Sequence, residues 1–128
     1  MPIIDSRHEL VQAADLTGSA LDYAVAMCEG KRLSGASLAY QIQEHGTVTD
    51  GFKRYSPSSD WEIGGPIIEL ARVRVTPFPP GREADGWSAG IYGKEIGVAG
   101  PTPLIAAMRC YVASKFQNGI DIPEELLK

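Results

Sequence analysis

The chain has 128 residues, of which 44% are hydrophobic and 22% are charged, and its formal net charge is −4. A chain of this length fits one domain with a core large enough to be stable without metals or disulfides. The acidic balance makes general attraction to nucleic-acid backbones unfavourable, and the basic pairs along the chain are short, so we expect no nucleic-acid partner. Neither a bilayer-spanning apolar run nor a secretory signal is recognisable, and we therefore expect a cytoplasmic protein without membrane association.

The first clearly predicted helix covers residues 19–29. Ser19 suits the N-cap, Asp22 follows at the third helical position, and Gly30 can end the helix in the left-handed conformation. The segment before this helix has two interpretations, a short helix that begins at Ser6 or a strand around residues 10–13. Periodicity does not choose between them.

The pattern is weaker from residue 31 to residue 57. Leu38, Tyr40 and Ile42 alternate with polar or small residues, which fits a short hairpin or a long ordered loop. In the stretch that follows, Ser58 or Ser59 can cap a helical turn. Pro66 suits the first turn of a helix that runs through Leu70, and the glycine pair before it makes one continuous helix doubtful.

An antiparallel meander of three strands is predicted at residues 72–76, 87–92 and 95–98. The first strand alternates Arg72, Arg74 and Thr76 with two valines, which is the period of a strand with one buried face. The three prolines of the next segment exclude it from a sheet, and Gly93 can supply the tight turn between the last two strands.

The last long helix begins after Thr102, which suits the N-cap, and Pro103 suits the first helical position. Its apolar stripe comprises Leu104, Met108, Tyr111, Val112 and Phe116. Capping explains this helix start without a bound phosphate, and Asn118-Gly119 ends the helix. The acidic segment that follows is expected to add a short final helix.

Few residues have the chemistry of a catalytic or metal site. Cys28 and Cys110 lie in apolar runs and are interpreted as reduced core residues, and His8 and His45 lie in polar stretches. Their spacings match neither a metal site nor a nucleophile–base pair, so we expect no catalytic residues, no metal and no cofactor.

Five residues remain as candidates for binding: Tyr55, Asp60, Trp61, Thr102 and Arg109. Asp60 and Glu62 flank Trp61, whose ring could raise a carboxyl pKa, but we favour a helix-start role for Asp60 and solvent exposure for Glu62. Trp61 could fill the gap left by the glycine pair against the last helix, or it could lie at the surface as an anchor for a partner; we favour burial. For Arg109 we favour the polar face of the last helix over an ion pair with Asp60 or Glu69.

Three stretches resemble the NinX family of small phage proteins, which are found in the accessory region of lambdoid phages and in prophages: "LTGSALDYAVAMCEG", "YSPSSDWEIGGPIIE" and "GPTPLIAAMRCYVASKFQNGIDIPEEL". The resemblance covers about half of the chain. It implies a phage accessory protein and a fold with an antiparallel sheet between helices, and it brings no catalytic residues or cofactor. Residues 1–15 are read as an N-terminal extension and residues 33–53 as an insertion.

These observations predict one α+β domain over residues 1–128, with three main helices packed on an antiparallel sheet. The favoured function is a non-catalytic module that binds a host or phage protein and forms a small homo-oligomer. The alternative is a small-molecule or nucleotide-binding enzyme. Its pocket would lie between the segment from Tyr55 to Trp61 and the start of the last helix.

Overall fold

A computed structural model describes residues 8–30, 48, 54–79 and 86–127, and it confirms the predicted α+β class. The helices are α1 (Gly18–Cys28), α3 (Trp61–Ala71) and α4 (Pro103–Lys115), with short 3₁₀ helices at Ala13–Asp15 and Glu124–Leu127. The strands are β1 (His8–Val11), β2 (Val73–Pro77), β3 (Trp87–Ile91), β4 (Gly97–Gly100) and β5 (Ile120–Pro123). They form a three-stranded sheet, ordered β2-β3-β4, and a separate pair of β1 and β5.

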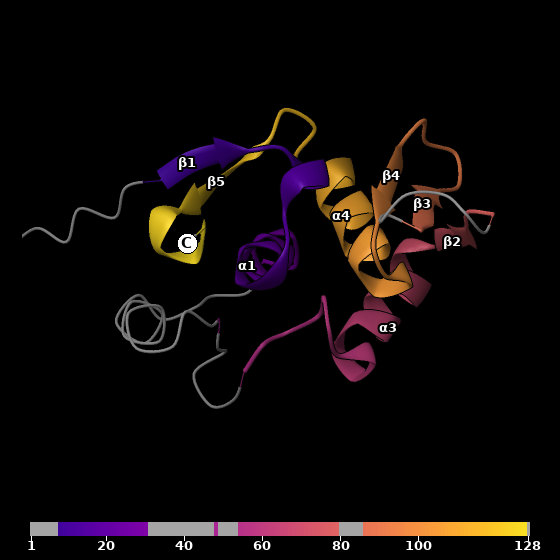
Figure 1. The fold of residues 1–128 in the computed structure, drawn as a ribbon, viewed down its shortest axis with the longest axis horizontal. Helices are drawn as coiled ribbons and strands as arrows, with labels where there is room; N and C mark the ends of the chain where they lie inside the picture. Colours follow the sequence, from indigo (N-terminus) through magenta and orange to yellow (C-terminus); the bar gives the residue numbers. More distant parts are fainter. Residues whose placement is uncertain (1–7, 31–47, 49–53, 80–85, 128) are drawn as a thin grey trace, which may run out of the picture.

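Helix α4 is the centre of the molecule. It lies between the three-stranded sheet and α1, so a helix, rather than the sheet, is the middle layer (Figure 1). The predicted stripe is buried at Leu104, Met108, Tyr111 and Val112. Phe116 is half-buried and is the C-cap, so the helix ends before the predicted Asn118-Gly119. The alanines between the buried stripe residues are buried as well. Small side chains on these other sides let neighbouring backbone approach closely, which makes α4 a core helix and not an amphipathic cover.

The predicted meander is confirmed, and every neighbouring pair of its strands is antiparallel. Val73 is buried and Val75 packs on the core, while Arg74 and Thr76 point to the other face. The third strand covers Gly97–Gly100 rather than residues 95–98, and the first strand begins one residue later than predicted. Arg72 instead ends α3 in the left-handed conformation, with φ at 57°.

Of the two interpretations of the N-terminal segment, the strand is correct, but β1 covers His8–Val11 rather than residues 10–13, and Ala13 begins a 3₁₀ helix. Its partner β5 was not predicted; the sequence suggested only a short helix after residue 120, and the 3₁₀ helix there follows β5.

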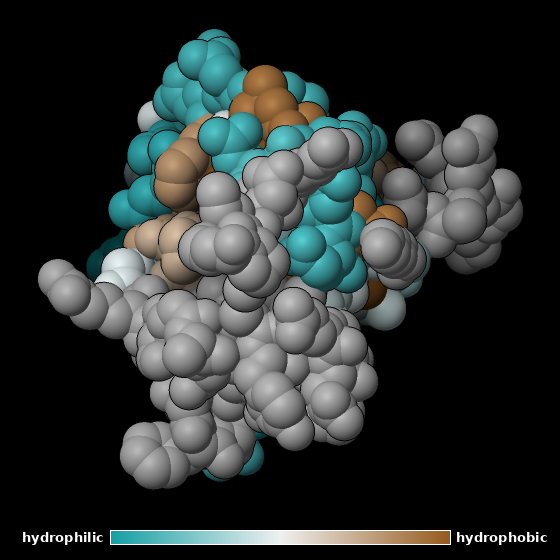
Figure 2. All heavy atoms as spheres, turned by 90° about the vertical axis from the view of Figure 1, so that its left-hand side faces the viewer, coloured by the Kyte–Doolittle hydropathy of each residue, from teal (hydrophilic) through white to brown (hydrophobic). Residues whose placement is uncertain are grey.

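On the side of the molecule that carries β1 and β5, hydrophobic residues appear in small separate areas among hydrophilic ones (Figure 2). Leu10 of β1 is 60% exposed.

The N-terminal end of α1 differs slightly from its prediction. The N-cap is Thr17 rather than Ser19, so Asp22 lies beyond the first turn instead of at the third helical position, and it is buried. Gly30 has a φ of 69°, as expected for the residue that ends the helix. The alternation of Leu38, Tyr40 and Ile42 lies outside the described residues.

Helix α3 is continuous through its glycine pair, contrary to expectation, and Pro66 lies inside the helix rather than in its first turn. Its N-cap is Asp60, not Ser58 or Ser59. A Cβ at Gly64 would stand 2.5 Å from the Pro57 carbonyl oxygen and 2.7 Å from Leu104 Cδ1. The glycine is therefore required by the close approach of α3 to α4, which compensates for its low helix propensity.

No helix in the described part of the chain is both long and apolar enough to span a membrane.

Candidate functional site

Of the five predicted binding residues, Tyr55 alone lines either of the two pockets described below. Tyr55 and Arg109 are buried, Asp60 is half-buried, and Trp61 and Thr102 are exposed. Each has its own local surroundings, and these decide what each side chain can contact.

Trp61 is the first residue of α3, and the prediction that it is a core residue is wrong. Its side chain is 55% exposed. The space beside Gly64 that it was expected to fill is taken by Leu104 and by the Pro57 carbonyl group. Trp61 therefore presents a large apolar side chain to solvent at the start of a helix.

Asp60 and Thr102 are helix caps. The Asp60 carboxylate accepts a hydrogen bond from the Glu62 backbone N–H at 3.0 Å, and the Thr102 hydroxyl accepts one from the Ile105 N–H at 3.1 Å. Each side chain thus satisfies an N–H group that has no partner within its own helix. The predicted cap at Thr102 is confirmed.

Arg109 is buried, and both predictions for its surroundings are wrong. Its Nε donates to the Leu16 carbonyl oxygen at 2.7 Å and its Nη1 to the Ala99 carbonyl oxygen at 2.9 Å. It lies neither on a polar face nor in an ion pair with Asp60 or Glu69. The guanidinium instead connects the chain before α1 to strand β4 through the central helix.

A second buried polar contact positions the segment before α3. The carboxylate of Asp22 on α1 accepts a hydrogen bond from the Ser58 backbone N–H at 2.9 Å, and both residues are buried. Burial raises the pKa of Asp22, and the hydrogen bonds from Ser58 partly oppose this shift. The contact holds the chain around Tyr55 against α1.

The location suggested for an enzyme pocket, between this segment and the start of α4, is closely packed at Gly64, Pro57 and Leu104. A shallow groove of about 170 Å³ lies on another side of α3. We call it the α3 groove, and it is lined by Glu29, Tyr55, Ile63, Pro66, Ile67 and Leu70.

The walls of the α3 groove are mainly apolar. Ile63, Pro66, Ile67 and Leu70 follow the i, i+3, i+4, i+7 spacing that places residues on one side of a helix, and Leu70 at the rim is 87% exposed. This spacing is visible in the sequence. Because one continuous helix across the glycine pair was considered doubtful, the apolar side of α3 was not predicted.

The polar groups that line the groove are the Tyr55 hydroxyl and the Glu29 carboxylate. The Tyr111 hydroxyl donates a hydrogen bond to Glu29, and burial raises the pKa values of Tyr55 and Tyr111, so both phenols stay neutral. Glu29 is the charged residue of the groove lining. The groove can therefore accept an apolar side chain with a cationic group beside it.

The thiols do not have the properties of nucleophiles. Burial raises the pKa of Cys110 to about 11 and that of Cys28 to about 12, so both are protonated at neutral pH. Both are free cysteines, as predicted. Across the described ranges, no three His, Cys, Asp or Glu side chains are grouped so that they could hold a metal ion.

The sequence was compared with curated proteins and with models of protein families. No curated protein matches it. The model of the family described as Bacteriophage P22, NinX, matches residues 12–115. Because this match extends over most of the 128 residues, the chain belongs to the NinX family of phage proteins.

Proposed function

We propose that this NinX-family chain is a phage accessory protein that acts without catalysis, by binding a host or phage protein through α3. The observation that carries the proposal is the exposure of Leu70 at the rim of the α3 groove, with Trp61 exposed at the start of the same helix. Large apolar side chains in or beside a concave surface are typical anchors of protein interfaces.

The chemistry of the groove indicates what the partner presents. Its apolar walls fit one aliphatic or aromatic side chain, and the carboxylate of Glu29 favours a lysine or arginine next to that anchor. Successive residues in a helix are rotated by about 100° around its axis. Trp61 lies nine residues before Leu70 on α3. Trp61 therefore points to a different side of α3 from Leu70 and would make a second, separate contact.

Site-specific photocrosslinking tests this proposal in infected cells. A photoreactive benzoylphenylalanine would replace Leu70, Trp61 or, as a matched control, Tyr92, which is 84% exposed on the turn after β3. We expect the same protein to be crosslinked from position 70 and, less efficiently, from position 61, but not from position 92. Added in excess without a photoreactive group, the Tyr92→Ser chain should compete for the partner and suppress crosslinking from position 70, while the Leu70→Ser chain should leave the crosslink in place.

Two results would contradict the proposal. Equal crosslinking from positions 70 and 92 would mean that α3 is not a selective surface. Crosslinks only between copies of this chain, with a matching increase in mass by sedimentation, would make α3 a self-association surface instead of a surface for another protein.

A further inference from the structure

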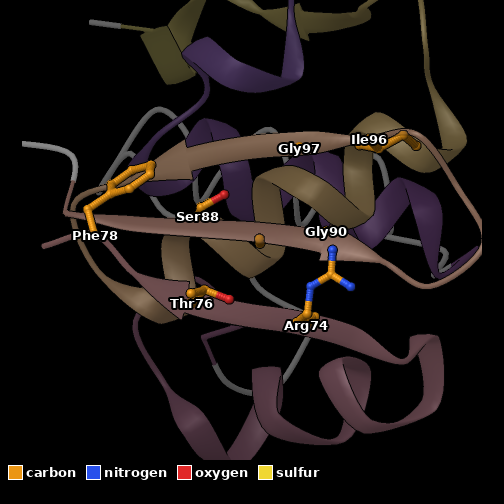
Figure 3. A pocket seen from close by; sticks show the side chains of 8 residues that line it. Arg74, Thr76, Phe78, Ser88, Gly90, Ile96 and Gly97 are labelled. Carbon is orange, nitrogen blue, oxygen red and sulfur yellow. The ribbon is translucent and has the colours of Figure 1, made fainter.

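The face of the three-stranded sheet that is turned away from α4 carries a shallow pocket of about 310 Å³ (Figure 3). It lies on β2, β3 and β4, apart from the α3 groove. Its lining comprises Arg74, Thr76, Phe78, Ser88, Ala89, Gly90, Ile96 and Gly97. None of these residues is acidic.

The register of the strands builds the pocket from two rows. In the first row Arg74 pairs with Gly90, which pairs with Gly97; in the second, Thr76 pairs with Ser88. The two glycines leave the first row without side chains on β3 and β4. The long side chain of Arg74 extends over this space toward Gly90, and the hydroxyls of Thr76 and Ser88 lie in the next row along the strands (Figure 3).

Gly90 is closely matched to the position of the arginine. A Cβ at this position would stand 3.1 Å from Arg74 Nη2 and 3.1 Å from the Ile96 carbonyl oxygen. A larger residue would therefore press on the guanidinium and shift it. The missing side chain at Gly90 opens the floor of the pocket and leaves room for the guanidinium in this position.

We propose that this pocket binds a small organic ligand through a carboxylate or phosphate group. Arg74 is an exposed cation, and none of the described residues forms a hydrogen bond or an ion pair with its guanidinium. A guanidinium binds two oxygens of either anion at once, and the hydroxyls of Thr76 and Ser88 supply further donors. Phe78 and Ile96, at opposite ends, provide apolar contact for the rest of the ligand (Figure 3).

The test is a titration of the ¹⁵N-labelled full chain at low salt, followed by NMR. Three probes share one ring: phenyl phosphate, benzoate and the neutral benzyl alcohol. We expect saturable shifts confined to the amides of the pocket with one or both anions, and much weaker shifts with benzyl alcohol. Tighter binding of phenyl phosphate would identify phosphate as the preferred group, and tighter binding of benzoate would identify carboxylate.

Variants separate a built site from general attraction to positive charge. Arg74→Gln should weaken binding about tenfold or more, because charge-assisted hydrogen bonds are lost. Arg72→Gln, a matched change of the same charge two residues away, should leave affinity within about twofold, which is too small a change for a lost charge-assisted bond. Gly90→Ala keeps every charge and should still weaken binding.

Equal losses of affinity in Arg74→Gln and Arg72→Gln would overturn the proposal. So would chemical-shift changes spread over the whole surface, or a titration in which neither anion gives saturable shifts. Melting curves of each variant check that the fold is retained; Arg74 and Arg72 are exposed, so we expect parental stability for both. The result does not depend on protein binding at α3, because neither Leu70 nor Trp61 lines this pocket.

Discussion

Arg109 in the middle of α4 donates a hydrogen bond from Nε to the carbonyl oxygen of Leu16, 93 residues earlier in the chain. Its Nη1 donates to the Ala99 carbonyl oxygen on β4. One buried side chain thus connects the segment before α1 with the three-stranded sheet. The guanidinium can be buried because its N–H groups donate hydrogen bonds to two carbonyl groups from separate elements.

Replacing Arg109 with Met, which fills similar space without donors, should lower the free energy of unfolding by about 2–4 kcal/mol, because two carbonyl acceptors lose charged donors. Urea denaturation with an unchanged m-value measures this loss. Arg109→Lys keeps the charge and can reach one carbonyl, so it should cost less. Identical losses in both variants would mean that the hydrogen-bond geometry contributes nothing.

The two neighbouring glycines of α3 should respond oppositely to alanine. Gly64→Ala would force a Cβ against Pro57 and Leu104 and should destabilise the protein by about 1–3 kcal/mol. Nothing lies within 4 Å of a Cβ at Gly65, and Gly65→Ala should stabilise it by about 0.5–1 kcal/mol through helix propensity. Thermal unfolding of the two variants measures both signs, and equal effects would contradict the close approach of α3 to α4.

Asp22 should make stability depend on pH. Burial raises its folded-state pKa above the ordinary value of 3.8, so the folded state binds this proton more tightly than the unfolded state. The contribution is fully present below the unfolded pKa and is lost as pH rises through the folded pKa. The stability of the parent relative to Asp22→Asn should therefore fall as pH increases from about 3.8 and then level off. Urea unfolding of both proteins across this range tests the sign, and a rising difference would contradict it.

The caps of α4 and α1 form a matched pair. Thr102→Ala removes the hydrogen bond to Ile105 and should cost about 1 kcal/mol. Thr17 is the N-cap of α1, but its side chain makes no capping hydrogen bond, so Thr17→Ala should cost clearly less. Chemical denaturation compares the two losses, and equal values would show that the hydroxyl of Thr102 does not act as a cap.

The two tryptophans should differ in their contribution to stability. Trp61 is exposed, and Trp61→Ala should change the free energy of unfolding by less than about 1 kcal/mol. Trp87 is half-buried against the core, and Trp87→Ala should cost clearly more. Differential scanning calorimetry measures both. A large loss on replacing Trp61 would restore its interpretation as a core residue.

Several features were determined by local chemistry in the sequence alone. The N-cap at Thr102, the left-handed glycine after α1 and the two-residue alternation of the meander depend only on neighbours along the chain. Each needs a backbone conformation or hydrogen bond that the nearby residue types themselves favour. The α+β class follows from these elements in order.

The tertiary structure decided what depends on residues distant in sequence. The pairing of β1 with β5 joins the two ends of the described chain, and the buried position of Arg109 depends on carbonyl groups of Leu16 and Ala99. Trp61 is exposed because Leu104 occupies the space beside Gly64. The α3 groove and the pocket at Arg74 likewise arise between elements. Periodicity predicts which side of an element is apolar, but packing selects the neighbour that covers it, and that choice depends on the shape and hydrogen-bonding needs of the whole core.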